Sequence, residues 1–431
     1  MEAIGTGRKR PAYNPISRVV PNWIPVPYSA LMKRLLNILF WSVIAAAFIG
    51  PGTVTTAARA GSDFRLALAW ALLFSVIACL VLQEASGRIT VLTGKELGEA
   101  IRGRFSGSGW GRSVPVLAAV GIILGCAAFE AGNLLGGVAG LRLLVDVSPA
   151  VLTLIAGGGA ALLLATGNTK WIARAAGALV AVMGAAFLVT AIRLGPDIGE
   201  LLRGLLVPRI PVGGTVLVLG LIGTTVVPYN LFLGSALARE SKIEEMRWGL
   251  AVAVIGGGVI SLGVLVVGTA LGGGLEYERL AAVLGDRLGG GAGASLAIGL
   301  FAAGFTSAVT APLAAALTAR SLLGEKDDPK WMENSLRYRA VWLGVLVVGM
   351  AFGIADVRPI PVIILAQAFN GLLLPLVAVF LWIAMNDRDL LGEGVNSRLQ
   401  NLVMGVVVLA CVGLGLRGVL AAIRGALAFI S

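Results

Sequence analysis

Long apolar stretches alternate along the chain with short polar loops. A helix needs about 20 apolar residues to cross the hydrocarbon core of a bilayer, and about eleven stretches approach or exceed that length. They lie near residues 31–60, 66–86, 115–143, 149–168, 175–194, 214–238, 248–272, 294–320, 338–355, 360–385 and 400–425. This pattern predicts an all-α membrane protein with about eleven transmembrane helices.

Two of these stretches, the first and the sixth, are interrupted at Gly50–Thr53 and at Val227–Asn230. The helix-breaking residues are Pro51, Gly52 and Pro228, because proline removes a backbone donor and glycine adds backbone freedom. A single interruption is commonly a proline kink. Two in corresponding positions indicate two inverted five-helix repeats with a binding site between broken helices 1 and 6.

This interpretation divides the chain into segments. We expect residues 1–30 to form a cytoplasmic tail and residues 31–431 to form a single transmembrane domain. Within that domain we assign residues 31–195 to the first repeat, residues 214–385 to the inverted second repeat, and residues 400–425 to an additional helix.

Lysine and arginine are unevenly divided between the loops. Segments 239–247 and 320–339 are rich in them, whereas alternate loops hold only scattered ones such as Arg65, Arg142, Arg203, Arg279 and Arg358. Basic loops stay in the cytoplasm, so we expect a multi-pass protein of the plasma membrane with its N-terminus inside and its C-terminus outside. The net charge of +11 follows from this topology. We therefore expect the lipid bilayer and not nucleic acid as partner, and a monomer.

Composition narrows the chemistry. The chain is 57% hydrophobic and 13% charged, against about 25% charged residues in soluble domains. It has no histidine, which excludes imidazole ligands and the side chain best suited to carry protons near neutral pH. All three cysteines lie in apolar stretches, so we expect reduced thiols. No arrangement of residues suggests catalysis or a cofactor, and an enzyme is not expected.

The residues at both interruptions resemble those of the Nramp family of divalent-metal transporters. Residues 50–53, with the small residues 60–62 after them, are similar to the family's Asp-Pro-Gly-Asn and its small-residue turn. Residues 223–230, Gly-Thr-Thr-Val-Val-Pro-Tyr-Asn, resemble Gly-Ala-Thr-Val-Met-Pro-His-Asn. Weaker similarities follow in order along nearly the whole chain, among them Ala302 and Gly304 with Ser307 and Thr310. The resemblance implies a LeuT-type fold and transport by alternating access.

The sequence departs from the family at the positions that carry its chemistry. In the family, an aspartate and an asparagine of the first helix and a methionine of the sixth bind the metal. Here those positions are Gly50, Thr53 and Val227. The family's histidines on the sixth helix become Tyr229 and Gly234. The resemblance thus implies a divergent member without the usual transition-metal ligands.

One carboxylate, Glu130, lies deep in an apolar stretch. An intramembrane acid is a functional candidate by default, and the alternative is a structural acid that is protonated or hydrogen-bonded. The family's third-helix aspartate, used in proton movement, is matched here by Ala127. We expect little or no proton coupling, with Glu130 as the only candidate for it.

The candidates for substrate binding are mostly neutral and polar. Gln367 and Asn370 lie about one helical turn apart, and they face the cavity or bond between helices. Arg59, beyond the first interruption, is interpreted as a snorkelling interface residue. The substrate-binding candidates are Gly50, Thr53, Thr224, Val227, Tyr229, Asn230, Gln367 and Asn370.

These residues favour some cargoes over others. Soft ligands select transition metals, and none is present at the interruptions, so Mn²⁺ and Fe²⁺ are disfavoured. A hydrated hard cation such as Mg²⁺, which keeps several waters, is the preferred prediction. A small organic or anionic solute is the first alternative, because Gly50 enlarges the cavity and removes a charge. An ordinary proton-coupled metal importer and a channel-like leak are further alternatives.

Overall fold

The computed structural model describes residues 49–106, 109, 111–166, 170–325 and 328–430. Its helices and the loops between them account for all of this part of the chain. The first seven helices are α2 (Pro51–Phe64), α3 (Ala69–Thr93), α4 (Leu97–Phe105), α5 (Ser113–Arg142), α6 (Pro149–Thr166), α7 (Lys170–Leu194) and α8 (Ile198–Leu206).

The remaining helices are α9 (Thr215–Thr225), α10 (Pro228–Leu237), α11 (Ile243–Gly268), α12 (Tyr277–Leu288), α13 (Gly291–Leu323), α14 (Leu336–Ile354), α15 (Pro359–Ala384), α16 (Arg388–Leu391) and α17 (Arg398–Ile430). Short 3₁₀ turns follow α10, α11 and α16 and precede α14, at Ala238–Glu240, Thr269–Leu271, Gly392–Gly394 and Pro329–Trp331.

Ten spans in the described part of the chain are long and apolar enough to cross a membrane. Each overlaps one of the predicted stretches after the first, so the expected all-α membrane architecture is confirmed. Of the first predicted stretch, residues 31–48 lie outside the described residues, and α2 forms its remaining part.

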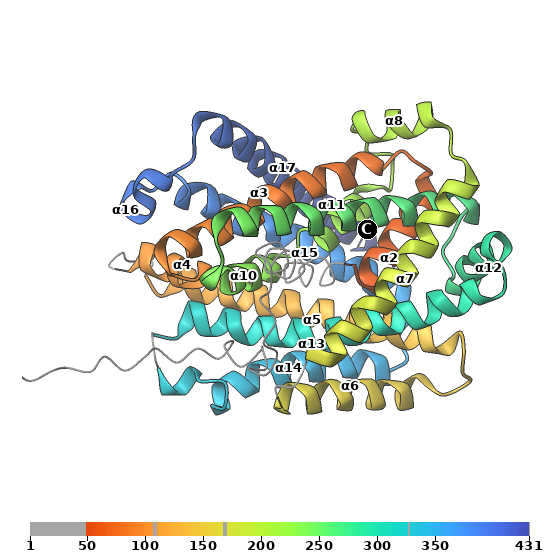
Figure 1. Cartoon of the computed structure of the whole chain (residues 1–431), viewed down its shortest axis with the longest axis horizontal. Coiled ribbons are helices and arrows are strands. Elements are labelled where there is room, and N and C mark those ends of the chain that lie inside the picture. The colour runs from red at the N-terminus through yellow and green to blue at the C-terminus, as the bar shows by residue number, and fades with distance from the viewer. Residues whose placement is uncertain (1–48, 107–108, 110, 167–169, 326–327, 431) are drawn as a thin grey trace, which may run out of the picture.

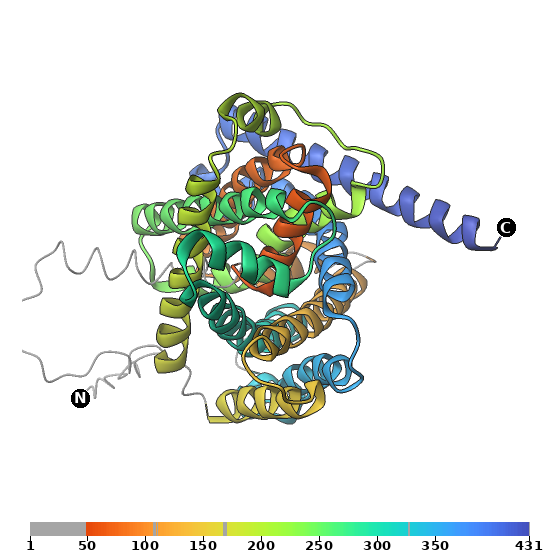
Figure 2. The ribbon, with the colours of Figure 1, turned by 90° about the vertical axis from the view of Figure 1, so that its right-hand side faces the viewer.

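The helices pack as a bundle around α2, α9, α10 and α15. Figure 1 places α3 and α11 above this group, and α5, α13, α14 and α6 below it. Figures 1 and 2 both show α5 and α13 side by side along their lengths. Glycine permits this approach, because a Cβ at Gly304 of α13 would lie 2.6 Å from the carbonyl oxygen of Asn133 on α5.

The structure shows the second interruption in full, whereas the first is described only from Ile49 onward. Gly50 is extended and α2 begins at Pro51, while Val226 and Val227 separate α9 from α10, which begins at Pro228. Each proline is therefore the first residue of a helix, where its missing N–H is not needed and its fixed φ favours the helix. The prediction that the unwound segments extend to Thr53 and Asn230 is corrected accordingly.

Candidate functional site

The two interrupted regions meet through a pair of threonines. Thr53 lies in the first turn of α2 and Thr224 in the last turn of α9. Their Oγ1 atoms are 2.9 Å apart, and both residues are buried. Residues 171 positions apart in the sequence are thus in direct contact, at the point where α2 begins and α9 ends.

Helix α15 closes this junction from a third side through Gln367. A Cβ at Gly52 would collide with the Gln367 amide, and one at Gly223 would collide with the Gln367 carbonyl oxygen. Glycine at these two positions is therefore what lets α2 and α9 approach α15. Both polar atoms of the Gln367 side chain are buried without a hydrogen-bond partner among the described residues.

The first turn of α10 adds Tyr229 and Asn230. The Tyr229 ring packs edge-on against Phe129 of α5, with ring centroids 5.4 Å apart. The Tyr229 hydroxyl and both amide atoms of Asn230 are buried and unpaired within the part of the chain that the structure describes. Val227, just before this turn, is buried and apolar.

Helix α13 brings a residue that the sequence analysis did not select. Ser307 is buried, and its Oγ would lie 3.4 Å from a Cβ built on Gly50. Ser307 lies in one of the stretches that resemble the Nramp family, but a serine in an apolar helix carries no sequence signal that distinguishes it from a back-bonded one.

Asn370, one turn after Gln367, is used differently. Its Nδ2 donates to the carbonyl oxygen of Ala366 at 3.1 Å and approaches that of Gly125 on α5 at 3.5 Å. The sequence left two alternatives for this pair, facing the cavity or bonding between helices. The hydrogen bonds of Asn370 fit the second, whereas Gln367 lies at the junction of the interrupted helices.

Glu130 lies on the side of α5 that faces α14. A Cβ at Gly349 would be 2.6 Å from its Cγ, so the side chain is packed between α5 and α14. It is fully buried, and its Oε2 accepts from Asn133 Nδ2 at 3.4 Å. A Cβ at Gly132 of α5 would lie 3.9 Å from Gln367 Nε2, and residues two apart on a helix point about 200° apart.

Arg59 lies at a depression about one turn beyond Thr56 of α2. Its Nε is 2.6 Å from Asp63 Oδ2. The depression has a volume of about 370 Å³ and is lined by Arg59, Asp63, Leu217, Ile360, Pro361, Ile364 and Leu365. Arg59 thus forms an ion pair with Asp63 at a recess between α2, α9 and α15. Its predicted position at the membrane interface stays a prediction.

The chemistry of the junction is that of neutral oxygen and nitrogen donors. No group of three or more His, Cys, Asp or Glu side chains that could hold a metal ion occurs in the described residues. The polar side chains around the two interruptions are hydroxyls and amides. They can accept and donate hydrogen bonds, but they do not offset the charge of a dehydrated dication.

Ten apolar spans, with the start of α2 in contact with the interrupted helix α9–α10, are the architecture of a polytopic membrane transporter. A family model described as "Natural resistance-associated macrophage protein-like" matches residues 42–421. The chain therefore belongs to the Nramp family, and it is a transporter and not an enzyme.

Relatives cover nearly the whole chain. The divalent metal cation transporters MntH of Yersinia pestis (strain Pestoides F) and Yersinia pseudotuberculosis (strain YPIII) are each 28% identical over 402 residues, which cover 89% of this chain and 95% of theirs.

Among solved structures, a manganese transporter of Eremococcus coleocola in complex with an aromatic bis-isothiourea compound is 19% identical. The match covers 91% of this chain and 88% of that one, with a TM-score of 0.72. MhsT in complex with L-phenylalanine is 18% identical over 90% of this chain and 98% of its own, with a TM-score of 0.57. These likenesses establish the expected LeuT-type fold.

Proposed function

We propose that this protein works by alternating access and carries a hydrated hard divalent cation such as Mg²⁺, with little or no proton coupling. The observation that carries the proposal is the junction of the two interrupted helices. There Thr53, Thr224, Asn230 and Gln367 present only neutral groups, several of them unpaired. Unpaired buried polar groups are costly, and water held around a cation would satisfy them.

The names of the relatives and the ligand groups at the junction each narrow the choice of cargo. Relatives named divalent metal cation transporters support a divalent cation. At the positions where the family carries an acid and a thioether, this chain has Gly50 and Val227. A dehydrated Mn²⁺ or Fe²⁺ would therefore lack both a charged and a soft ligand. Mg²⁺ gives up its water reluctantly, so amides and hydroxyls are suitable partners for its hydration shell.

Weak proton coupling follows from the placement of the acid. Glu130 packs against α14 at Gly349, on a face of α5 other than the one near Gln367. The chain has no histidine to replace it. Glu130 remains the single coupling candidate, and it would act without touching the cargo.

A small organic or anionic solute is the second candidate. The observation that favours it is Arg59, which lines a largely apolar recess beside α2, α9 and α15. The positive charge of Arg59 at this recess would attract an anionic solute, although Asp63 neutralises part of that charge. An ordinary proton-coupled metal importer and a channel-like leak are the outcomes that would replace both.

The setting we propose is the plasma membrane, with the N-terminus in the cytoplasm and the C-terminus outside. The lipid bilayer is its partner, and the protein acts as a monomer. We assign residues 31–195 and 214–385 to the two inverted repeats and residues 400–425 to a peripheral helix.

The test is ion flux into proteoliposomes. We expect saturable Mg²⁺ uptake with a millimolar KM, no Mn²⁺ uptake at micromolar concentration, and no acidification of the lumen. Saturable Mn²⁺ uptake that acidifies the lumen, abolished in Glu130→Gln, would instead identify a proton-coupled metal importer. Linear, unsaturable flux would identify a leak, and stabilisation by an uncharged or anionic metabolite but not by Mg²⁺ would favour the organic solute.

A gain of transition-metal binding provides the reverse test. A Cβ at Gly50 meets only Ser307 Oγ, at 3.4 Å, among the described residues, so an acid has space to enter there. The triple variant Gly50→Asp, Thr53→Asn, Val227→Met should bind Mn²⁺ measurably by calorimetry. Val227→Met alone is the matched control and should not, because it adds a soft ligand without a charge. Binding by the single variant would show that ligands outside these three positions suffice.

A further inference from the structure

The hydroxyl of Ser307 is directed at the start of α2. Ser307 lies on α13 and is 2% exposed. Its Oγ would be 3.4 Å from a Cβ at Gly50, and it has no hydrogen-bond partner among the residues the structure describes. Gly50 is the extended residue that immediately precedes α2.

Neighbouring hydroxyls on α13 behave differently. Thr306 Oγ1 donates to the carbonyl oxygen of Ala302 at 2.8 Å, and Thr310 Oγ1 donates to that of Thr306 at 2.8 Å. Serine and threonine in helices commonly satisfy themselves in this way. Two buried hydroxyls of α13 remain unpaired in the described structure, those of Ser307 and Thr318, and Ser307 is the one next to Gly50.

The position of Ser307 is rigidly determined. Gly304, three residues earlier on α13, is packed against α5, where a Cβ would lie 2.6 Å from the carbonyl oxygen of Asn133 and 2.7 Å from Gly137 Cα. Helix α13 therefore cannot rotate to pair Ser307 elsewhere without opening the α5–α13 contact. A buried hydroxyl that lacks a partner destabilises the folded protein, so its retention next to the break indicates a partner supplied from outside.

We propose that Ser307 contacts the cargo. Its hydroxyl oxygen accepts a hydrogen bond from the water shell of the cation, opposite Thr53 of α2 and Gln367 of α15. The site is then built from three sides, with α13 as a fixed wall that the interrupted helices face. The nature of the cargo rests on the proposed function, whereas the position of Ser307 on the cargo's path does not.

Removal of the hydroxyl tests the contact. Ser307→Ala should raise the KM for Mg²⁺ about fivefold, since that is the change in affinity equivalent to one ordinary hydrogen bond. It should not lower the melting temperature, because no protein partner is lost. Thr306→Ala, the adjacent hydroxyl with an internal partner, is the matched control and should leave KM unchanged. An unchanged KM in Ser307→Ala would overturn the proposal.

A cysteine at position 307 tests whether this position lines the transport path, whatever the cargo is. Ser307→Cys, made in a variant whose native Cys79, Cys126 and Cys411 are changed to alanine, should be modified by a small water-soluble methanethiosulfonate, and the cysteine-free parent should not. Mg²⁺ at ten times its Kd should slow the modification about tenfold, by occupancy. Micromolar Cd²⁺, which prefers thiolate, should block flux in this variant alone.

The outcomes distinguish the two proposals. If the thiol is modified but Mg²⁺ neither protects it nor crosses the membrane, the cation proposal fails and Ser307 still lines the path. If Mg²⁺ flux is intact in wild-type protein while the thiol is neither modified nor sensitive to Cd²⁺, the inference about Ser307 fails and the transport function stands.

Discussion

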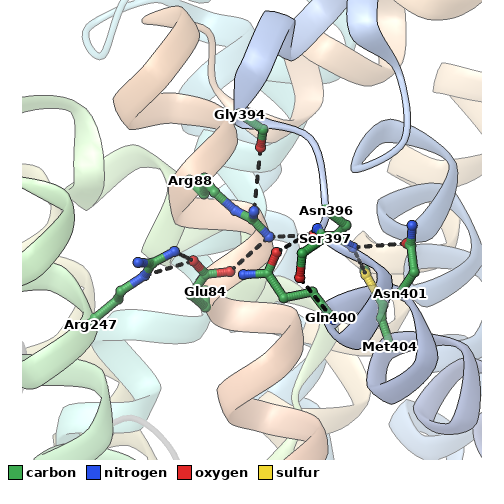
Figure 3. Close-up of polar contacts among 9 residues, drawn as sticks. All are labelled: Glu84, Arg88, Arg247, Gly394, Asn396, Ser397, Gln400, Asn401 and Met404. Atoms are coloured by element: carbon green, nitrogen blue, oxygen red, sulfur yellow. Dashed lines mark hydrogen bonds and ion pairs between the residues drawn. The ribbon is translucent and has the colours of Figure 1, made fainter.

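Two buried polar regions of this transporter are organised in opposite ways. The first is the network at the junction of α3, α11 and the start of α17 (Figure 3), where charged groups pair with one another. Arg88 Nη2 is 3.1 Å from Glu84 and 2.5 Å from Asn396 Oδ1, and Nη1 donates to the carbonyl oxygen of Gly394 at 3.3 Å. Arg247 binds the same glutamate at 2.6 Å.

The second region is the junction of the interrupted helices, which contains neutral groups with few partners. Asn230, Gln367 and Ser307 are at most 2% exposed, and none of their side-chain polar atoms is paired in the described structure. Each buried unpaired group costs about 1–3 kcal/mol. The comparison indicates that the charged network stabilises the fold, whereas the neutral junction gives up stability in return for groups that can receive a cargo.

Breaking the charged network should have the largest effect. Arg88→Met removes the guanidinium of a residue that is 6% exposed and leaves Asn396 and Gly394 without their donor, so we expect a loss of about 3 kcal/mol in the free energy of unfolding. Arg247→Gln is the control, because Arg247 is 46% exposed on its side chain and an exposed pair contributes below about 1 kcal/mol. Thermal unfolding in one detergent compares them. Equal losses would show that burial does not distinguish the two arginines.

Two asparagines sharpen the contrast within the membrane. Asn370→Leu loses the bonds to Ala366 and Gly125 and should cost about 1–2 kcal/mol while transport continues. Asn230→Leu loses no internal partner, so stability should stay constant or rise, while flux falls below detection. Melting temperature and proteoliposome flux are measured on both. A larger destabilisation in Asn230→Leu would mean that this amide is paired in the folded protein.

The helices were predictable because length and apolarity alone decide which segments cross a bilayer. The ten later spans depended on nothing else. The break between α9 and α10 was also predictable, but not from proline alone, since Pro312 and Pro375 lie inside the continuous helices α13 and α15; it was the matching position of the two interruptions that indicated it. Their exact residues were not, because a proline that ends one segment and a proline that starts the next give the same sequence signal. The structure resolves this by placing Pro51 and Pro228 as first helical residues.

The faces of the helices were not predictable. Gln367 and Asn370 are both amides on one apolar helix, and close contacts such as those of Gly52 and Gly223 with Gln367 fix the rotation of α15. Glu130 was identified as a buried acid, but its direction depends on the glycine at position 349 of a distant helix. Tertiary contacts between small residues decide such rotations, and an apolar helix without a polar face gives no hydrophobic pattern that would reveal them.

Glu96 shares a property with each of the two regions. Like the Arg88 network it is a buried charge, and like the junction it lies close to α10, at the C-terminal end of that helix. It precedes α4 and is 9% exposed. Arg239, just after α10, lies 3.6 Å from its Oε1, and Arg320 of α13 lies 3.8 Å from the same atom. Burial raises the pKa of Glu96, and the two arginines, opposed by the nearby Glu99, offset only part of that shift.

Ionisation of Glu96 therefore costs more free energy in the folded protein than in the unfolded chain. Of the predictions made here, the resulting effect of Glu96 on the pH dependence of stability is the smallest. A raised pKa means that the folded state binds the proton more tightly, so this residue's contribution to stability falls as pH rises from the ordinary glutamate range through the folded pKa. Glu96→Gln should flatten the melting temperature between pH 4.5 and pH 7, by an equivalent of about 1 kcal/mol or less. Glu333→Gln is the control, since Glu333 is 65% exposed and 4.0 Å from Arg320, and it should keep the wild-type profile. A steeper fall with pH in Glu96→Gln would mean that the two arginines outweigh burial, and that Glu96 belongs with the stabilising charges of the Arg88 network.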